Sequence, residues 1–216
     1  MHHLASNTQG LNRFRDIAKR LAQTLLIGAW LIAGGAVASL TDAETLDAAE
    51  LAPLPEHEAT TRHILKALRE RHYLYQLLDD ESSALIFDEY LSALDPSKSY
   101  FSAQDMLAFE PYRITLDNAL RRGDLRPAFS IFNQYQAQTI ARLTWVISQL
   151  EQGLEPYQFD VDETLELDRS DAPWAKDQAA LDDLWRRRIK NDILNLKLAD
   201  KDPADITTLL LKRYQN

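Results

Sequence analysis

The stretch 124–152 constrains the fold more than any other part of this 216-residue chain. Its large side chains recur at steps of three and four residues: Leu125, Phe129, Phe132, Gln136, Ile140, Leu143, Ile147 and Leu150. Such steps average about 3.6 residues per turn, so they place these side chains on one face of an α-helix. Ile131 and Trp145 widen the apolar arc. We therefore expect a long helix, capped by Asp124 and followed by Gly153, at the centre of a bundle.

Shorter amphipathic segments lie on both sides of this helix. In chain order we expect helices from Thr60 or Thr61, from Ser82 to Leu94, from Ser102 to about Phe109, from Pro111 to Gly123, from Asp177, and from Asp202-Pro203. The residues that open these segments cap or begin helices well, and no segment alternates with a period of two. The predicted fold is all-α, a bundle of about six helices around a long central helix, after an N-terminal signal peptide.

The N-terminal segment 1–38 has the pattern of a secretory signal peptide. Four basic residues at positions 13–20 precede a nearly uncharged stretch, 21–35, which ends on Ala36-Val37-Ala38. A basic lead, a short apolar run and a small-residue exit are typical of export signals. We expect cleavage after Ala38, with Ala36 and Ala38 as the recognised small residues, and export to a bacterial periplasm. An uncleaved membrane anchor is the alternative.

The segment 39–57 is acidic and contains Pro53 and Pro55, which favour an extended backbone. We expect it to be a mobile acidic lead to one helical domain, 58–216. The last predicted helix reaches Asn216 without a closing cap, so we expect the domain to be truncated there. As a hypothesis, the apolar face of that helix, with Leu209, Leu210 and Tyr214, requires a downstream partner.

Composition excludes several classes of function. A net charge of −9 argues against sequence-independent binding to nucleic acid. The absence of Cys removes disulfides, thiolate metal sites and thiol nucleophiles. Only six glycines occur, and none forms a phosphate-binding motif. We expect no cofactor, no metal, no nucleic acid and no stable membrane span after signal cleavage.

Two groups of residues superficially resemble metal sites. His57, Glu58 and His63 suggest a zinc-protease helix, but histidines six residues apart lie on different helix faces, and His72 cannot complete the set. The second group contains Asp160, Asp162 and Asp168, as in a calcium loop, but Leu165 stands where an EF-hand requires glycine. We interpret both as surface residues.

Two further clusters have local explanations. Arg186, Arg187 and Arg188 point in different directions on a helix, so we expect a solvated face or local ion pairs. The densest cluster is the string Asp168-Arg169-Ser170-Asp171-Ala172-Pro173-Trp174. Asp and Ser side chains bond nearby backbone, Pro fixes a turn and Trp buries a large area, so a pinned structural loop is expected. Ser170 has no evident general base, which argues against catalysis.

At this string the chain becomes recognisable. Thr164 to Trp174, with its D-R-S-x-A-P-W pattern, resembles the N-terminal domain of tail-specific proteases, which are periplasmic C-terminal processing peptidases. The resemblance extends to Ile86–Asp95, to Leu184-Trp185 through Leu198, and to the last helix up to Tyr214. It covers about residues 54–216.

The resemblance implies a helical domain that precedes a PDZ domain and a protease core with a Ser-Lys dyad. Such enzymes cleave proteins that carry apolar C-terminal tails. No position of this chain matches the dyad, so no catalytic residue is carried over and we expect the chain to be non-proteolytic alone. The resemblance implies a scaffold that docks the PDZ and protease regions, protein substrates and an envelope lipoprotein adaptor.

Three alternatives stay open at this point. The chain could be a free-standing exported interaction protein that binds an envelope partner. It could be half of a split gene whose protease half lies downstream. An independent enzyme of another class is the third alternative.

Overall fold

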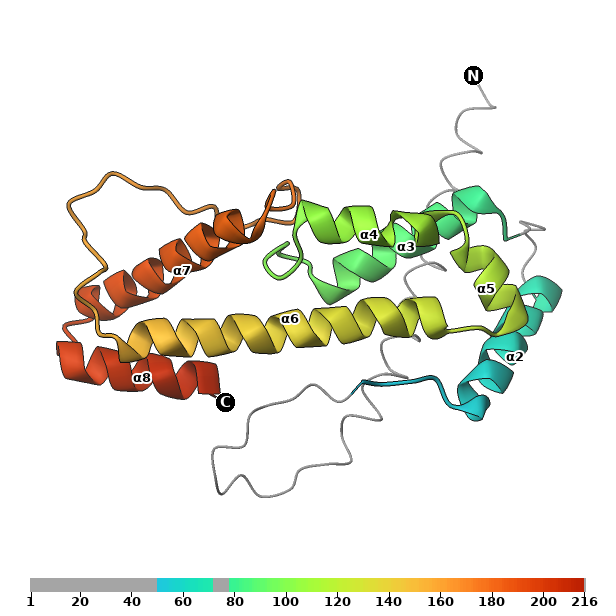
Figure 1. Ribbon diagram of the computed structural model, residues 1–216, viewed down its shortest axis with the longest axis horizontal. Helices are drawn as coiled ribbons and strands as arrows, with labels where there is room; N and C mark the ends of the chain where they lie inside the picture. Colours follow the sequence, from blue (N-terminus) through green and yellow to red (C-terminus); the bar gives the residue numbers. More distant parts are fainter. Residues whose placement is uncertain (1–49, 72–77, 216) are drawn as a thin grey trace. The chain divides into compact units, whose positions relative to one another are not determined.

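The computed structural model describes residues 50–71 and 78–215, and within these ranges it is built from helices (Figure 1). The helices are α2 (Pro55–Arg71), α3 (Asp80–Leu94), α4 (Ala103–Arg113), α5 (Leu116–Arg122), α6 (Arg126–Glu151), α7 (Gln178–Leu198) and α8 (Pro203–Gln215). No strand forms in the described ranges; one isolated parallel bridge pairs Ser102 with Ala175. The all-α prediction is confirmed. The predicted signal peptide with Ala36 and Ala38, most of the predicted lead, and His72 lie outside the described residues.

The chain divides into two compact units, which are described separately. Of the described residues, the first unit comprises 50–71, 78–94 and Leu107–Gln134, and the second comprises Asp95–Met106 and 135–215. The predicted long helix is confirmed as α6, which runs from the first unit into the second. In the part of the chain that the structure describes, no helix is both long and apolar enough to cross a membrane.

Helices α2 and α3 both pack against α5 in the first unit. The buried apolar residues of this unit include Ile86, Phe87, Tyr90, Leu91, Leu94, Phe109, Leu116, Leu120, Leu125, Phe129, Ile131 and Phe132. The Tyr90 hydroxyl donates a hydrogen bond of 3.0 Å to the Ala128 carbonyl and so joins α3 to α6. Burial raises the pKa of Tyr90, because the phenolate would lose its hydration.

Two helix starts in this unit differ from the sequence prediction. Helix α2 begins at Pro55, five residues before Thr60, because proline suits the first helical position and two acids follow in the first turn. Helix α3 is capped by Asp79, whose carboxylate accepts the N–H of Ser82 at 2.9 Å and its hydroxyl at 2.8 Å. These bonds lower the pKa of Asp79. The predicted cap, Ser82, is instead buried in the first turn.

Pro111 does not start a helix as predicted; it lies inside α4, which continues to Arg113. Pro111 has no N–H to donate to the carbonyl of Leu107, four residues earlier, and both residues are exposed. The predicted stop at Gly123 is confirmed. Gly123 ends α5 with φ 75°, and a Cβ there would lie 2.6 Å from Cγ of Glu58.

Two predicted helix caps are confirmed in the second unit. Ser102 and Asp105 form a capping box: the Ser102 N–H donates to Asp105 Oδ2 at 2.7 Å, and the Asp105 N–H donates to Ser102 Oγ at 3.4 Å. Asp177 caps α7 by accepting the N–H of Ala180 at 2.9 Å.

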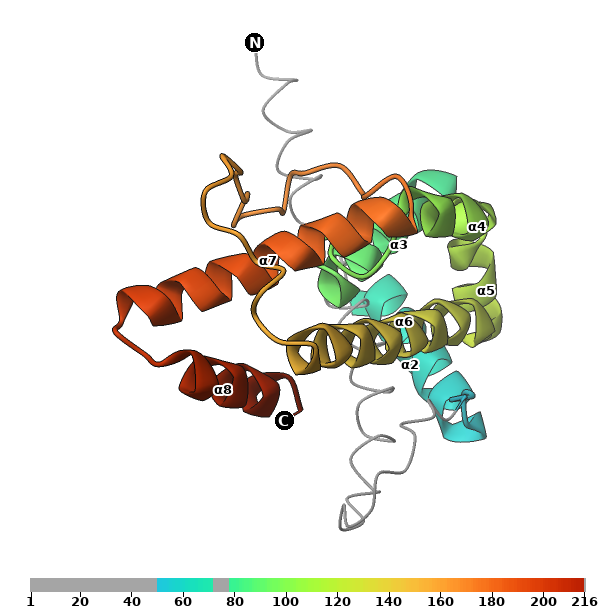
Figure 2. The ribbon, with the colours of Figure 1, turned by 60° about the vertical axis from the view of Figure 1, so that its left-hand side comes forward.

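Helices α7 and α8 form a hairpin whose inner faces supply much of the second core (Figure 2). That core contains Val146, Leu150, Tyr157, Trp185, Ile189, Ile193, Ile206 and Leu210. Leu210 is fully buried, and the Tyr214 hydroxyl donates to Asp192 at 2.8 Å. The hypothesis of an unpartnered α8 face is therefore wrong for Leu210 and Tyr214, since α7 already covers them; Leu209 remains exposed.

Candidate functional site: the Asp95 turn and the motif loop

The Asp95 turn, residues 95–102, is organised around one buried carboxylate. Asp95 is only 1% exposed. Its Oδ1 accepts the N–H of Ser99 at 2.9 Å, and its Oδ2 accepts the N–H groups of Tyr100 and Phe101 at 2.9 and 3.0 Å. Three backbone donors that burial would otherwise leave unpaired are thereby satisfied. The same carboxylate therefore fixes the backbone of the turn.

Helix α7 holds this turn from another side. The indole N–H of Trp185, in the second core, donates to the Ser99 carbonyl at 2.7 Å. The Tyr100 ring lies 5.6 Å from the Trp185 ring between centroids. A buried indole requires an acceptor for its N–H, so the turn and α7 stabilise each other.

The motif loop, residues 168–177, is held internally by short-range bonds. Asp168 accepts the N–H of Ser170 at 3.1 Å and its hydroxyl at 2.8 Å. These bonds lower the pKa of Asp168. Arg169 donates to the carbonyl of Pro173 at 3.4 Å, and the Ala172 N–H donates to the Arg169 carbonyl at 3.1 Å. The loop is thus a compact succession of turns.

Four contacts join the motif loop to the Asp95 turn. Lys98 Nζ donates to the Ala172 carbonyl at 2.7 Å and lies 5.6 Å from the centre of the Trp174 ring. The Trp174 ring meets Phe101 in a T-shaped contact at 6.3 Å. The Ala103 N–H donates to the Ala175 carbonyl at 2.8 Å, beside the isolated bridge. Ala172 and Trp174, which the sequence singled out, therefore lie at a junction of two irregular segments.

Lys98 has an unusual backbone at this junction. Its φ of 47° lies in the left-handed region, which residues other than Gly seldom adopt. Its side chain supplies an ammonium for Ala172 and for the Trp174 ring, which glycine could not do. No structural role was predicted for Asp95 or Lys98, since the sequence predicted only that a helix ends at Leu94, just before them. The available signal was an Asp followed by a short Ser-containing turn, a pattern that commonly bonds its own backbone.

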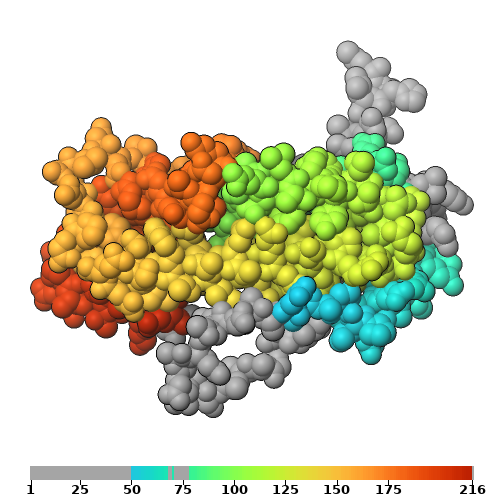
Figure 3. All heavy atoms as spheres, in the orientation of Figure 1, coloured from blue at the N-terminus to red at the C-terminus, as the bar shows by residue number. Residues whose placement is uncertain are grey.

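The outer connection, residues 158–167, lies at the surface between α6 and the motif loop (Figure 3). Charged contacts tie it to α7. Glu163 accepts hydrogen bonds from Arg186 and Lys190, which lower its pKa to about 2. Arg187 donates to the Thr164 carbonyl at 3.1 Å and pairs with Asp183. The sequence left two explanations for the run Arg186, Arg187 and Arg188, a solvated face or local ion pairs. Local ion pairs apply to Arg186 and Arg187.

The residues that resembled metal sites do not converge. His57 stacks on Phe129 with centroids 6.0 Å apart, whereas His63 is exposed. Asp160 and Asp162 are exposed on the outer connection. Within the described ranges, no group of three His, Cys, Asp or Glu side chains could hold a metal ion.

The junction fixes the start of α4 against the start of α7, a structural role for both segments. Residues 64–216, which include the whole junction, match the family described as "Tail specific protease N-terminal domain". A curated relative, the "Tail-specific protease" of Haemophilus influenzae, is 35% identical over 160 residues. The alignment covers 74% of this chain and 23% of the relative, so the chain spans about a quarter of that protein's length. The chain therefore belongs to the family of tail-specific protease N-terminal domains.

Proposed function

We propose that this chain is the helical scaffold domain of an exported tail-specific protease, and that the enzyme's PDZ and protease regions dock onto it. The observation that carries the proposal is the family match across residues 64–216, which takes in the Asp95 turn, the motif loop and the α7–α8 hairpin. The relative's much greater length supports a larger enzyme with further regions. The reaction of that enzyme would be cleavage of proteins with apolar C-terminal tails.

The chemistry of the motif loop supports a role other than peptide hydrolysis. Acyl transfer needs a nucleophile paired with a base that can take its proton. The Ser170 hydroxyl donates to Asp168, a carboxylate whose lowered pKa makes it a poor base near neutral pH. The ammonium of Lys98 is held by the Ala172 carbonyl. We propose that these groups hold the loop and that the protease region supplies the catalytic residues.

Exposed leucines give the proposed docking a physical basis. Leu194 and Leu198 lie four residues apart on α7, and Leu209 lies on α8; they are 38%, 74% and 44% exposed. Leucines four apart share one helix face. Burial of such side chains against another region would be favourable. The envelope lipoprotein adaptor and the protein substrates remain part of the proposal on family resemblance alone.

A complementation experiment tests the scaffold role. The chain and the remainder of the enzyme would be expressed as separate proteins and mixed with a protein that ends in an apolar tail. We expect no cleavage by the chain alone and recovery of cleavage when both parts are present. A double variant, Leu194→Asp with Leu198→Asp, should weaken the recovery, whereas Asp160→Asn should not. Full cleavage by the remainder alone would contradict the scaffold role, and a stable complex with a different envelope protein alone would favour the free-standing interaction protein.

We also propose periplasmic localisation after cleavage of residues 1–38. The support is the basic lead, the apolar run and the Ala36–Ala38 exit. Mass spectrometry of the chain recovered from the envelope should find Ser39 as the first residue. Replacement of Ala38 by a bulky residue should retain the uncleaved form, and an intact Met1 in the native protein would contradict the proposed cleavage.

A further inference from the structure

The outer face of α7 carries cations at its middle and at its C-terminal end, and the two places are covered differently. At the middle, Arg186 and Lys190 both donate to the carboxylate of Glu163, at 3.2 and 2.6 Å. Arg187 donates to the Thr164 carbonyl at 3.1 Å. The outer connection therefore supplies the acceptors for the cations at the middle of the helix.

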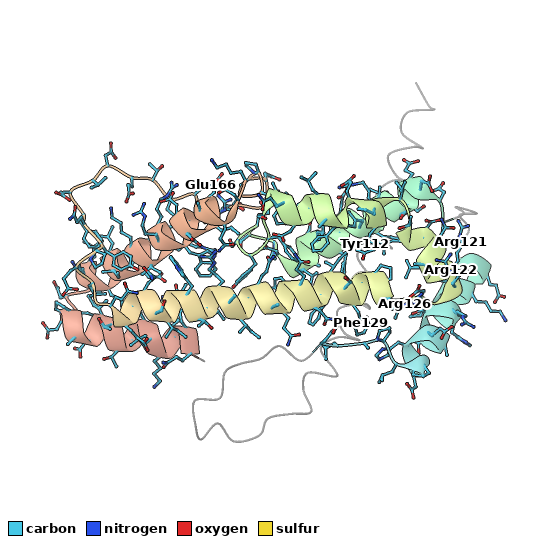
Figure 4. All side chains as sticks on the ribbon, in the orientation of Figure 1. Tyr112, Arg121, Arg122, Arg126, Phe129 and Glu166 are labelled. Carbon is cyan, nitrogen blue, oxygen red and sulfur yellow. The ribbon has the colours of Figure 1, made fainter. Side chains whose placement is uncertain are left out.

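The C-terminal end of the same face has a cation without such an acceptor. Lys197 lies seven residues after Lys190, which is about two helical turns, so both side chains lie on one side of α7. Both ammonium groups contact the ring of Phe159, at 5.7 Å for Lys190 and 4.4 Å for Lys197. Among the described residues, no carboxylate forms an ion pair with Lys197. Glu166, which is labelled in Figure 4, pairs with Arg169 of the motif loop instead.

Apolar side chains lie beside this cation. Leu194 is one turn from both Lys190 and Lys197, and Leu198 is one turn beyond Leu194. Both leucines are exposed, and Phe159 is 36% exposed. We name Phe159, Leu194, Lys197 and Leu198 the α7 end face; all four belong to the second unit. The face therefore combines three large apolar side chains with one positive charge.

We propose that the α7 end face receives a segment of the remaining enzyme in which a carboxylate lies beside apolar side chains. The middle of α7 provides the model for this contact, since Glu163 of the outer connection accepts from Lys190 while Phe159 packs against the same ammonium. The partner segment does the same for Lys197 and buries the two leucines, which is favourable in itself. Charge complementarity orients the docking. This inference rests on the proposed function, because the partner belongs to the protease that the function requires.

Carbodiimide cross-linking of the whole enzyme tests the contact. The reagent joins a lysine amine to a carboxylate that touches it and adds no spacer. We expect mass spectrometry to find a link from Lys197 to an Asp or Glu downstream of Asn216, with apolar residues next to that acid. High salt during the reaction should reduce this link, because surface charges are screened. Lys66, which lies 3.9 Å from Glu70, is the positive control for the reagent.

The outcomes separate this inference from the proposed function. Links between other lysines of the chain and the downstream region, with none at Lys197, would overturn the inference and leave the proposed docking in place. A link from Lys197 only to acids of this chain would overturn it as well. Failure of the two separately expressed parts to associate would overturn the proposed function and this inference together.

A pair of leucine variants tests the apolar part of the contact. Leu198→Asn removes an exposed apolar side chain without adding a charge, so the yield of the link at Lys197 should fall about tenfold. Leu107→Asn is the matched control, since Leu107 is 76% exposed on α4 of the first unit and should leave the yield unchanged. Lys197 also lies in the last turn of α7, where a cation stabilises the helix, and the denaturation midpoint of each variant separates that effect from docking. An unchanged yield in Leu198→Asn would overturn the proposal.

Discussion

The Asp95 turn and the outer connection are both irregular segments of the second unit, yet different interactions hold them. In the turn, a carboxylate that is 1% exposed accepts three backbone N–H groups. In the outer connection, Glu163 pairs with cations at the surface, and Val161 and Leu167 are 52% and 74% exposed. Buried acceptors are costly to lose, whereas water replaces surface pairs easily. Irregular structure therefore does not by itself mean weakly held structure.

The largest effect should follow removal of the Asp95 carboxylate. Asp95→Ala leaves three backbone donors without their acceptor inside the unit, so we expect a loss of about 3–5 kcal/mol in the free energy of unfolding. Asp160→Ala in the outer connection removes an exposed carboxylate and should change it by less than about 0.5 kcal/mol. Urea denaturation of both variants measures the difference. Comparable losses of unfolding free energy in the two variants would contradict the view that the Asp95 turn is held more strongly than the outer connection.

The two tryptophans that contact the Asp95 turn should rank next. Trp185→Phe removes the N–H bond to Ser99 and part of a ring that is 5% exposed, so we expect a loss of about 2–3 kcal/mol. Trp174→Phe retains a ring beside Phe101 at a half-buried position and should lose about 1 kcal/mol. Denaturation midpoints under identical conditions check the order. A larger loss for Trp174→Phe would place the main anchor in the motif loop instead.

Much of this arrangement follows from sequence because it depends on local rules. The spacing of apolar residues predicts α6, and the Ser102–Asp105 and Asp177 caps follow from side chains that bond backbone within three residues. The D-R-S-x-A-P-W string identifies the family. The junction does not follow, because it joins Lys98 to Ala172, which are 74 positions apart. No local pattern encodes which distant carbonyl a lysine reaches.

The errors at helix ends have a related cause. Pro111 looked like a helix start because proline favours the first turn, but it is also tolerated near an exposed helix end. Thr60 looked like a cap, but its hydroxyl instead bonds the carbonyl of Glu56 inside α2. In both cases, several positions satisfy the local rule and packing decides among them. The two hydrogen bonds between the Asn133 amide and the Leu51 backbone were missed for the same reason, since these residues lie 82 positions apart.

Loss of the Lys98 ammonium should have a smaller effect than Trp185→Phe and an effect similar to that of Trp174→Phe. Lys98→Met keeps most of the side-chain length but removes the bond to Ala172 and the cation beside Trp174, so we expect a loss of about 1 kcal/mol. Lys176→Met is the control, because Lys176 is 83% exposed and lies 3.7 Å from its partner Asp177. Thermal or urea unfolding should separate the two. Equal stability of Lys98→Met and the unaltered chain would show that the aromatic contact and the backbone bridge hold the junction without the lysine.

The smallest effect, and the one that best characterises the outer connection, is a dependence on pH. Arg186 and Lys190 hold the pKa of Glu163 at about 2, below its ordinary value of 4.5. Because the folded-state pKa is the lower one, the contribution of Glu163 is fully present above about pH 4.5 and is lost as the pH falls towards 2. The difference in unfolding free energy between the unaltered chain and Glu163→Gln should therefore be constant from pH 7 to about 5 and shrink below that.

Urea unfolding at several pH values measures this difference. Added salt should reduce the difference even at neutral pH, since surface pairs are screened. A difference that persists unchanged towards pH 2 and in high salt would mean that Glu163 stabilises the connection through packing, and the contrast with the Asp95 turn would then be one of degree only.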